Sequence, residues 1–437
     1  MNHLTLFLPC ASGVEPYLVQ EATKILGRKD GITPQSAGVS IEASWREALL
    51  LNLHSRLASR VLIQVQGGNY RSEQDIYQAA CDVAWEIWFT ERHTFKIDIT
   101  ATRSPLKSIN FAALRVKDAI CDRFRHKTCE RPSVDVQRPD ARIYVHLSAD
   151  QLFLYVDTSG EPLFKRGWRQ DKGEAPLKET LAAAMLAASG WWNLEGQERE
   201  YQPLYDPCCG SGTIAIEAAQ IALGIPAGGQ RRFGFERLIP FQDHVWDAMK
   251  NVANYVNPMP ANSLKSLKIP FIYGSDVAHR MADFAQRNAE LAGVSDAIEF
   301  RGGDALQRKP PCELPPQGAV ILTNPPYGER IEVAGFAGRP SSEQSHPRAQ
   351  IRSVGRETAE FNEQEGDFFP QLAAHWKTHF DGWTAWLLVP DMKLPGKMRL
   401  KETRRVPLWN GPIECRLFRF DIQGRRNPPT SPPPAAP

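Results

Sequence analysis

The feature that most constrains the fold is a strand–turn–helix unit that recurs in the second half of the chain. Residues 203–223, PLYDPCCGSGTIAIEAAQIAL, combine an apolar strand pattern, a glycine-containing turn and a helix pattern. Residues 271–294 repeat this order, and residues 298–306 begin it again. Strands that alternate with helices predict a mainly parallel sheet with helices on both faces. We therefore expect an α/β domain over residues 176–423.

The first half of the chain has shorter elements. Three segments show the helical spacing of apolar residues, at 13–27, 44–56 and 110–124. Six others show the alternation that is typical of strands, at 3–9, 38–43, 60–66, 94–101, 142–148 and 152–159. This mixture predicts α+β structure, in which small sheets carry helices on one face.

Three segments fit neither pattern. Residues 159–175 are rich in glycine, proline and charge, which predicts a linker between the two halves. The polar stretch Val333–Gly366 lacks periodicity and is expected to form a mobile loop. The proline-rich residues 424–437 are expected to be a disordered tail.

Composition excludes several classes of protein. The 437 residues exceed what one core usually holds, and 42% apolar with 23% charged residues is ordinary for a soluble globular protein. No apolar run reaches about 18 residues, and no basic region precedes the first apolar run, so we expect neither a membrane span nor a signal peptide. The eight cysteines include no C-x-x-C pair. We expect reduced thiols, no metal site and a cytoplasmic location.

The turn YDPCCGSGT is the first candidate site. Gly210 and Gly212 allow a sharp turn and a close approach of the backbone to a ligand. With Ala215 they also match the G-x-G-x-x-A pattern of dinucleotide sites. A glycine turn without any ligand is the alternative.

Two aspartates follow the next two strand patterns. Asp276 could accept hydrogen bonds from two neighbouring ribose hydroxyls, and Asp304 could reach an adenine amino group. Such an acidic residue usually lies about 20 residues beyond the turn, but an insertion over Gly224–Pro270 lengthens that separation here. Either aspartate could instead cap a helix.

The fourth strand pattern runs into Asn324, Pro325, Pro326 and Tyr327. Because proline cannot donate a ladder hydrogen bond, the two prolines end the strand and fix the backbone. The Asn324 side-chain oxygen and a nearby backbone carbonyl are then expected to converge on one point, where they suit a planar NH2 group with two hydrogens. Tyr327 offers a flat face for a base to stack on. This arrangement fits the exocyclic amine of a nucleobase; a simple strand-ending Pro-Pro turn is the alternative.

The expected chemistry follows from that amine. Its lone pair is delocalised into the ring, and two hydrogen bonds can hold the nitrogen closer to tetrahedral and free the pair. A sulfonium methyl group placed in line could then be transferred in one displacement, with much of the rate coming from proximity and orientation.

At this point the sequence resembles a known family. The segments DPCCGSGTIAIEAA, YGSD, NPPYGER and GEAPLKETLAAAMLAASGW are similar to those of class I S-adenosylmethionine methyltransferases that modify exocyclic amines. The match is closer to bacterial large-subunit (23S) ribosomal RNA guanine-N2 methyltransferases with a THUMP domain, through NFAALRVKDAICDRFR, RPSVDV and HLSADQLFLYVDTSGEPLFKRGWR. The resemblance covers residues 3 to 423.

The resemblance implies an order of domains. A ferredoxin-like segment would occupy residues 1–55 and a THUMP RNA-binding domain residues 56–158. After the linker, a Rossmann-like methyltransferase domain with an antiparallel last strand would occupy residues 176–423. Some family members carry a second, fused methyltransferase; the length of this chain leads us to expect the stand-alone form.

The resemblance also implies the roles of site residues. Asp206, Pro207, Gly210 and Gly212 would approach the methionine part of S-adenosyl-L-methionine. Asp276 would hold its ribose and Asp304 its adenine region. Asn324 would border both the cofactor and the target base, which Pro325 to Tyr327 help to hold. Cys208 and Cys209 would be small residues of the turn rather than nucleophiles.

Charge placement is consistent with RNA. Residues 101–142 contain ten Lys or Arg and five Asp or Glu. Basic side chains there and in the linker could neutralise phosphates, and the candidates are Lys117, Arg123, Arg125, Lys127, Lys165, Arg166 and Arg169. For any one of these residues, a solvated helix face is the alternative.

We therefore expect a guanine-N2 methyltransferase acting on ribosomal RNA or an assembling large subunit, with no obligate protein partner. An adenine-N6 methyltransferase acting on DNA or RNA stays open, because Asn-Pro-Pro-Tyr alone does not separate the two. An inactive RNA-binding assembly protein and a nicotinamide-dependent enzyme are further alternatives.

Overall fold

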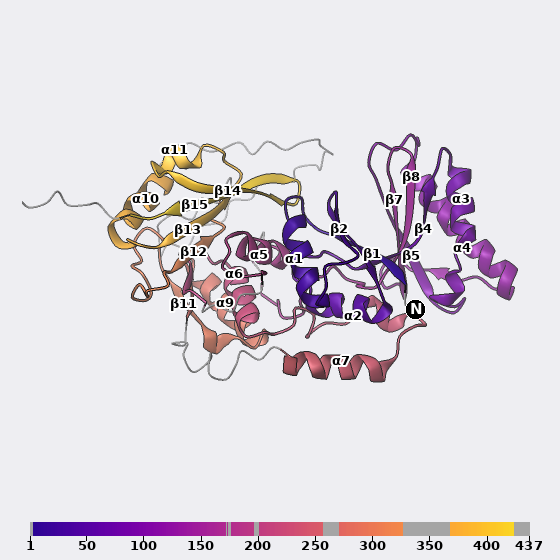
Figure 1. The fold of residues 1–437 in the computed structure, drawn as a ribbon, viewed down its shortest axis with the longest axis horizontal. Helices are drawn as coiled ribbons and strands as arrows, with labels where there is room; N and C mark the ends of the chain where they lie inside the picture. The colour runs from indigo at the N-terminus through magenta and orange to yellow at the C-terminus, as the bar shows by residue number, and fades with distance from the viewer. Residues whose placement is uncertain are drawn as a thin grey trace, which may run out of the picture.

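The computed structural model describes residues 3–171, 173, 176–195, 201–256, 271–326 and 368–423. Each half of the chain builds one large sheet (Figure 1). The expected mobile loop and tail, Val333–Gly366 and 424–437, lie outside the described residues. In the described part, no helix has the length and apolar character that a membrane crossing requires.

The N-terminal sheet has eight strands in the order β2-β3-β1-β4-β8-β7-β5-β6. Its strands are β1 (Leu4–Pro9), β2 (Ile32–Gln35), β3 (Gly38–Ala43), β4 (Leu62–Asn69), β5 (Thr94–Ala101), β6 (Ser133–Val134), β7 (Ala141–Leu147) and β8 (Gln151–Asp157). Its helices are α1 (Glu15–Leu26), α2 (Trp45–His54), α3 (Glu73–Asp82), the short η1 (Trp85–Ile87) and α4 (Ile109–Thr128).

This sheet differs from the small separate sheets that we expected. Strand β4 pairs antiparallel with β1 on one side and with β8 on the other. It therefore joins the first strands of the chain to those of residues 94–157 in one hydrogen-bonded ladder. Alternation of apolar residues identifies strands, but it does not say which strands pair.

The C-terminal sheet has seven strands in the order β11-β10-β9-β12-β13-β15-β14. The first five are parallel, and β15 inserts antiparallel between β13 and β14. The strands are β9 (Leu204–Asp206), β10 (Ile272–Asp276), β11 (Ile298–Gly302), β12 (Val320–Thr323), β13 (Thr384–Val389), β14 (Glu402–Asn410) and β15 (Ile413–Asp421). This arrangement confirms the α/β class and the antiparallel last strand.

Helices cover both faces of this sheet. The helices of the C-terminal half are α5 (Glu179–Ala188), α6 (Thr213–Ala222), η2 (Gly234–Arg237), α7 (Asp243–Val256), α9 (His279–Leu291), η3 (Ser295–Ala297), α10 (Phe368–His379) and α11 (Leu394–Met398), of which α7 lies beside α2 (Figure 1). Neighbouring strand residues point to opposite faces: Leu204 packs into the cluster that contains α6, and Tyr205 packs into the one that contains α10. Every residue of α6 is buried, including the polar Thr213, Glu217 and Gln220.

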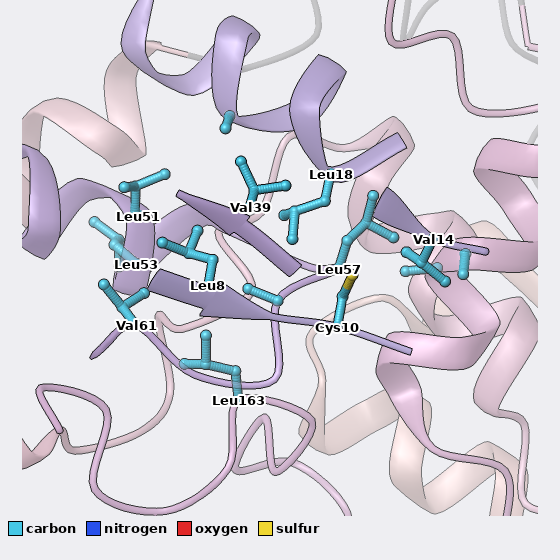
Figure 2. Packing of buried hydrophobic residues seen from close by; sticks show 14 of the residues in the cluster. Leu8, Cys10, Val14, Leu18, Val39, Leu51, Leu53, Leu57, Val61 and Leu163 are labelled. Atoms are coloured by element: carbon cyan, nitrogen blue, oxygen red, sulfur yellow. The ribbon is translucent and has the colours of Figure 1, made fainter. Parts of the chain in front are cut away.

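The two halves share one hydrophobic core. The cluster around β1 and α1 continues without a break into α5 and α6. Leu163, which follows β8, packs into the cluster beside Leu8 and Val61 (Figure 2). The linker is therefore part of the core rather than a free tether.

A buried network of charges crosses the same junction. Glu217 of α6 forms ion pairs with Arg56 at 2.9 Å and with Arg166 at 3.0 Å. The Arg166 guanidinium also donates to the Arg56 carbonyl at 2.8 Å, and the Arg56 amide donates to Glu21 of α1 at 2.7 Å. Burial opposes ionisation of Glu217, yet the two arginines lower its pKa. The network ties the N-terminal half to the helix that follows the glycine turn.

Candidate functional site

The carboxyl ends of four parallel strands meet at one edge of the C-terminal sheet. In the register, Asp206 of β9 lies opposite Gly274 of β10, and Asp276 of β10 lies opposite Gly302 of β11. Strand β12 pairs with the other side of β9. Ligands of open α/β sheets bind at such an edge, where the strand order reverses beside the first strand.

The glycine turn uses its two glycines differently. Both have positive φ angles, +52° at Gly210 and +85° at Gly212. A Cβ atom at Gly212 would lie 2.9 Å from the Ala285 Cβ atom and 3.0 Å from the Phe300 ring, so packing requires glycine there. A Cβ atom at Gly210 would meet nothing within 4 Å. Gly210 therefore keeps the backbone exposed to open space, as a turn that receives a ligand needs.

Asp276 holds this turn in place. One of its carboxylate oxygens accepts a hydrogen bond from the Gly210 amide at 3.0 Å, and the other accepts from the Ala278 amide at 3.0 Å. Burial raises the pKa of Asp276. Its carboxylate keeps acceptor capacity beyond these two bonds, since each oxygen has two lone pairs.

Asp304 lies just beyond the end of β11, the strand that pairs with β10. Its carboxylate accepts a hydrogen bond from the Leu306 amide at 2.9 Å, which closes a local turn. The residue also lines a cleft of about 440 Å³ together with Arg301, Gln307 and Arg308. The structure thus places Asp304 beside an open cleft.

Asp206 is the most deeply buried carboxylate of the edge, with 1% of its surface exposed. It accepts hydrogen bonds from the Thr323 hydroxyl at 2.7 Å and from the Cys208 amide at 3.2 Å. Burial raises its pKa to about 7, although these two bonds act in the opposite direction. No cation pairs with Asp206 in the ranges that the structure describes, so the site is suited to receive one.

The turn also contains Pro207 and two cysteines. The Pro207 carbonyl accepts a long hydrogen bond, of 3.5 Å, from the Ser275 hydroxyl of β10. Burial raises the pKa of both Cys208 and Cys209 well above that of a free thiol. Both side chains therefore stay protonated at neutral pH, where a thiol is a weak nucleophile.

Asn324 follows β12 directly and is placed by it. All four residues of β12 are buried, and Thr323 at its end donates to Asp206. The Asn324 side-chain oxygen is buried and has no hydrogen-bond partner in the described part of the protein. Such an oxygen costs free energy unless a donor reaches it. Pro325 is buried and Pro326 half-buried, whereas Tyr327 lies outside the described residues.

Sequence reasoning missed the role of Arg169. Its guanidinium donates to the Glu179 carboxylate at 2.8 Å, to the Ser211 hydroxyl at 2.7 Å and to the Thr213 hydroxyl at 2.8 Å. It therefore clamps the glycine turn to the first residue of α5. We had expected Arg169 to contact phosphate, because it lies in a basic linker. The sequence gives no sign that the donors of this arginine are used inside the protein.

The expected phosphate contact of Arg166 is contradicted more clearly. Only 2% of its surface is exposed, and it pairs with Glu217 inside the protein. The prediction that Arg166 contacts phosphate is wrong, because its charge is already neutralised in the core.

The other predicted phosphate contacts lie nearer the surface. Arg123 forms a two-bond pair with Glu86, and Lys127 lies 3.4 Å from the same carboxylate. Three exposed side chains pair with neighbours on their own segments: Lys117 with Asp118, Arg125 with Asp122 and Lys165 with Glu161. Their role in RNA binding stays a prediction.

Comparison with known proteins identifies the three parts of the chain. Residues 5–62 match the RlmL ferredoxin-like domain, and residues 70–157 match the THUMP domain. Residues 166–338 match the RMKL-like methyltransferase domain. The chain therefore carries a THUMP domain and an RMKL-like methyltransferase domain. The ferredoxin-like match ends at the first residue of β4, the strand that joins the two sets of strands in the N-terminal sheet.

Curated relatives are similar to this chain over nearly its whole length. The ribosomal RNA large subunit methyltransferase K/L of Psychromonas ingrahamii is 34% identical over 426 residues, which are 97% of this chain and 51% of that protein. The chain spans about half the length of the curated relatives it matches.

Solved structures share the fold over nearly the whole chain. SMU.472, solved in complex with SAH, has a TM-score of 0.76 at 24% identity and covers 98% of this chain and 100% of its own. A protein described as "a predicted N6-adenine-specific DNA methylase" from Listeria monocytogenes has a TM-score of 0.76 at 25% identity, with 97% of both chains covered.

Proposed function

We propose that this methyltransferase transfers a methyl group from S-adenosyl-L-methionine to the exocyclic N2 amine of a guanine in large-subunit (23S) ribosomal RNA. The observation that carries the proposal is the buried Asn324 oxygen, which has no partner among the described residues and lies at the edge that also holds the glycine turn. An amine hydrogen of the target base would supply the missing donor. We infer large-subunit ribosomal RNA as the substrate from the name of the K/L relatives, and a cytoplasmic location from that substrate.

The residues of the edge suit this cofactor. Asp206, buried without a cation, would hold the ammonium group of the methionine part. Gly210 leaves open space in front of the turn, Asp276 has remaining acceptors that would bind the ribose hydroxyls, and Asp304, which lines a cleft of about 440 Å³, would contact the adenine. The cofactor supplies an electrophilic methyl group on a sulfonium sulfur.

The protein's own contribution is to prepare the amine. The Asn324 oxygen and a neighbouring backbone carbonyl accept its two hydrogens and draw the nitrogen lone pair out of conjugation with the ring. The two prolines fix both acceptors, so little reorganisation is needed during the reaction. The amine nitrogen would form the new bond to the methyl carbon with its lone pair, while the methyl–sulfur bond breaks and leaves its electron pair on sulfur. The nitrogen would then release one proton to water.

An adenine amine presents the same two hydrogens, so adenine N6 is the second candidate. The name of the Listeria relative supports adenine N6 as a candidate. The THUMP match and the K/L relatives favour RNA and guanine N2 instead.

Asn324→Ala tests the role of the amide. We expect methyl transfer to protein-free large-subunit ribosomal RNA to fall by at least about a hundredfold, because a donor-matched acceptor in a closed site contributes on the order of 10²–10³ to the rate. Cofactor affinity, measured by calorimetry, should change by less than about threefold. Transfer at the wild-type rate in the variant would exclude the proposed role.

A further inference from the structure

A second cleft, of about 450 Å³, lies where the parts of the chain meet. Its walls come from the β1–α1 loop, the residues before β4, the linker, the start of α5 and the β14–β15 turn. The loop and β14 are close together: a Cβ atom at Gly13 would lie 2.3 Å from the Pro407 carbonyl oxygen. Figure 1 shows the end of β14 beside α1 and α5. The cleft therefore has one wall in the N-terminal half and one in the catalytic half.

The charge of this cleft is one-sided. Arg60 and Lys178 line it, and none of its lining residues carries a carboxylate. Lys178 is exposed, and its ammonium group lies 5.4 Å from the centroid of the Phe164 ring. Among the residues that the structure describes, no carboxylate forms an ion pair with Lys178. Arg60 is partly neutralised, since one of its terminal nitrogens donates to Asp157.

The rest of the lining combines apolar residues with aromatic rings and hydroxyl groups. The Trp409 ring near the end of β14 offers a flat apolar surface, and Ser12, Ser59 and Thr180 offer hydroxyl groups. A volume of about 450 Å³ lies in the range of sites for small organic ligands. A cation, an aromatic ring and hydroxyl groups without a carboxylate together suit a ligand with a phosphate, a flat base and a sugar.

We propose that this cleft binds one unpaired nucleotide of the RNA substrate, with its phosphate at Lys178 and its base on Trp409. The inference rests on the proposed function for the identity of the ligand as RNA. The walls of the cleft come from both halves of the chain. This position favours a nucleotide within an RNA strand over a free nucleotide. The next residue, Glu179, bonds to the arginine that clamps the glycine turn, so the bound strand would pass within a helical turn of the cofactor machinery.

Binding of a fluorescent ten-nucleotide single-stranded oligoribonucleotide to the full chain tests the cleft. Lys178→Ala should weaken binding several-fold and reduce the slope of log affinity against log salt by about 0.7, the value for one lost phosphate contact in a single strand. Lys178→Arg should restore most of the affinity. Lys401→Ala removes another exposed lysine of the catalytic domain and should leave affinity and slope unchanged.

Photo-crosslinking with 4-thiouridine in the same oligonucleotide locates the strand. We expect crosslinks in peptides that contain Phe164 or Trp409. Equal affinities of the Lys178→Ala and Lys401→Ala variants, or crosslinks that avoid both peptides, would overturn the proposal. Loss of GMP binding in Lys178→Ala with unchanged oligonucleotide binding would overturn it in favour of a free nucleotide. If the wild type binds RNA through Lys178 and transfers no methyl group, the proposed function fails and the cleft stands.

Discussion

At the scale of single residues, the site is defined by polar groups that the protein buries without full compensation. Asp206 accepts two hydrogen bonds yet lacks a cation in the described ranges, and the Asn324 oxygen lacks a donor there. Both cost stability in the free protein. In the proposed function, an ammonium group and an amine would supply the missing partners. Functional sites often carry such costs.

The raised pKa of Asp206 gives a prediction for stability against pH. The folded protein binds the Asp206 proton more tightly than the unfolded chain, so this residue's contribution is fully present below about pH 3.9, its unfolded pKa. The contribution is lost as pH rises to about 7. Asp206→Asn should therefore gain stability relative to the wild type with rising pH, by at most about 1.4 kcal/mol per pH unit. Urea denaturation of both proteins from pH 4.5 to 8.5 measures the difference; a difference independent of pH would contradict the burial argument.

Residue types were predictable where the chain offers a strict pattern, and their partners were not. Gly210, Gly212, Asp276 and Asn324 follow apolar strand patterns, so their common position at the sheet edge could be predicted. Arg166 lies in a segment that reads as solvated, and its partner Glu217 is 51 residues further on. Nothing local in the sequence indicates that pair.

At the scale of elements, α6 is the connection between the N-terminal half and the glycine turn. It begins directly after Gly212, and its Glu217 neutralises Arg56 and Arg166. Burying three charged groups is stable only while the carboxylate is present, because two arginines would otherwise be left unpaired.

Glu217→Gln should therefore lower the free energy of unfolding by about 3–5 kcal/mol. Glu161→Gln is the matched control, since Glu161 is exposed and pairs with Lys165 at the surface. The Glu161→Gln substitution should lower the free energy of unfolding by less than about 1 kcal/mol. Chemical denaturation of both variants makes the comparison, and similar losses in the two would show that the buried network contributes no more than a surface pair.

Elements themselves were largely predictable, whereas their assembly into sheets was not. The alternating segments of the first half became strands, and the helical segments became α1, α2 and α4. These strands form one eight-stranded sheet because β4 pairs with β1 along one edge and with β8 along the other. Which edges pair is decided by long-range packing, and strand propensity carries little information about it.

At the scale of the whole molecule, the two halves form one cooperative body. One hydrophobic cluster contains residues of β1 and α1 together with residues of α5, α6 and β15. We expect calorimetry to show a single unfolding transition whose calorimetric and van't Hoff enthalpies agree. Two well-separated transitions would mean that the shared core and the Glu217 network do not couple the halves.

The most direct test of the central claim is the identity of the methylated nucleoside. The purified chain is incubated with protein-free large-subunit ribosomal RNA and methyl-labelled S-adenosyl-L-methionine, and the digested RNA is analysed by mass spectrometry. We predict that the label appears as N2-methylguanosine and disappears with Asn324→Ala. Label found as N6-methyladenosine would contradict the guanine assignment, and no label in any nucleoside would contradict the proposed activity on this RNA.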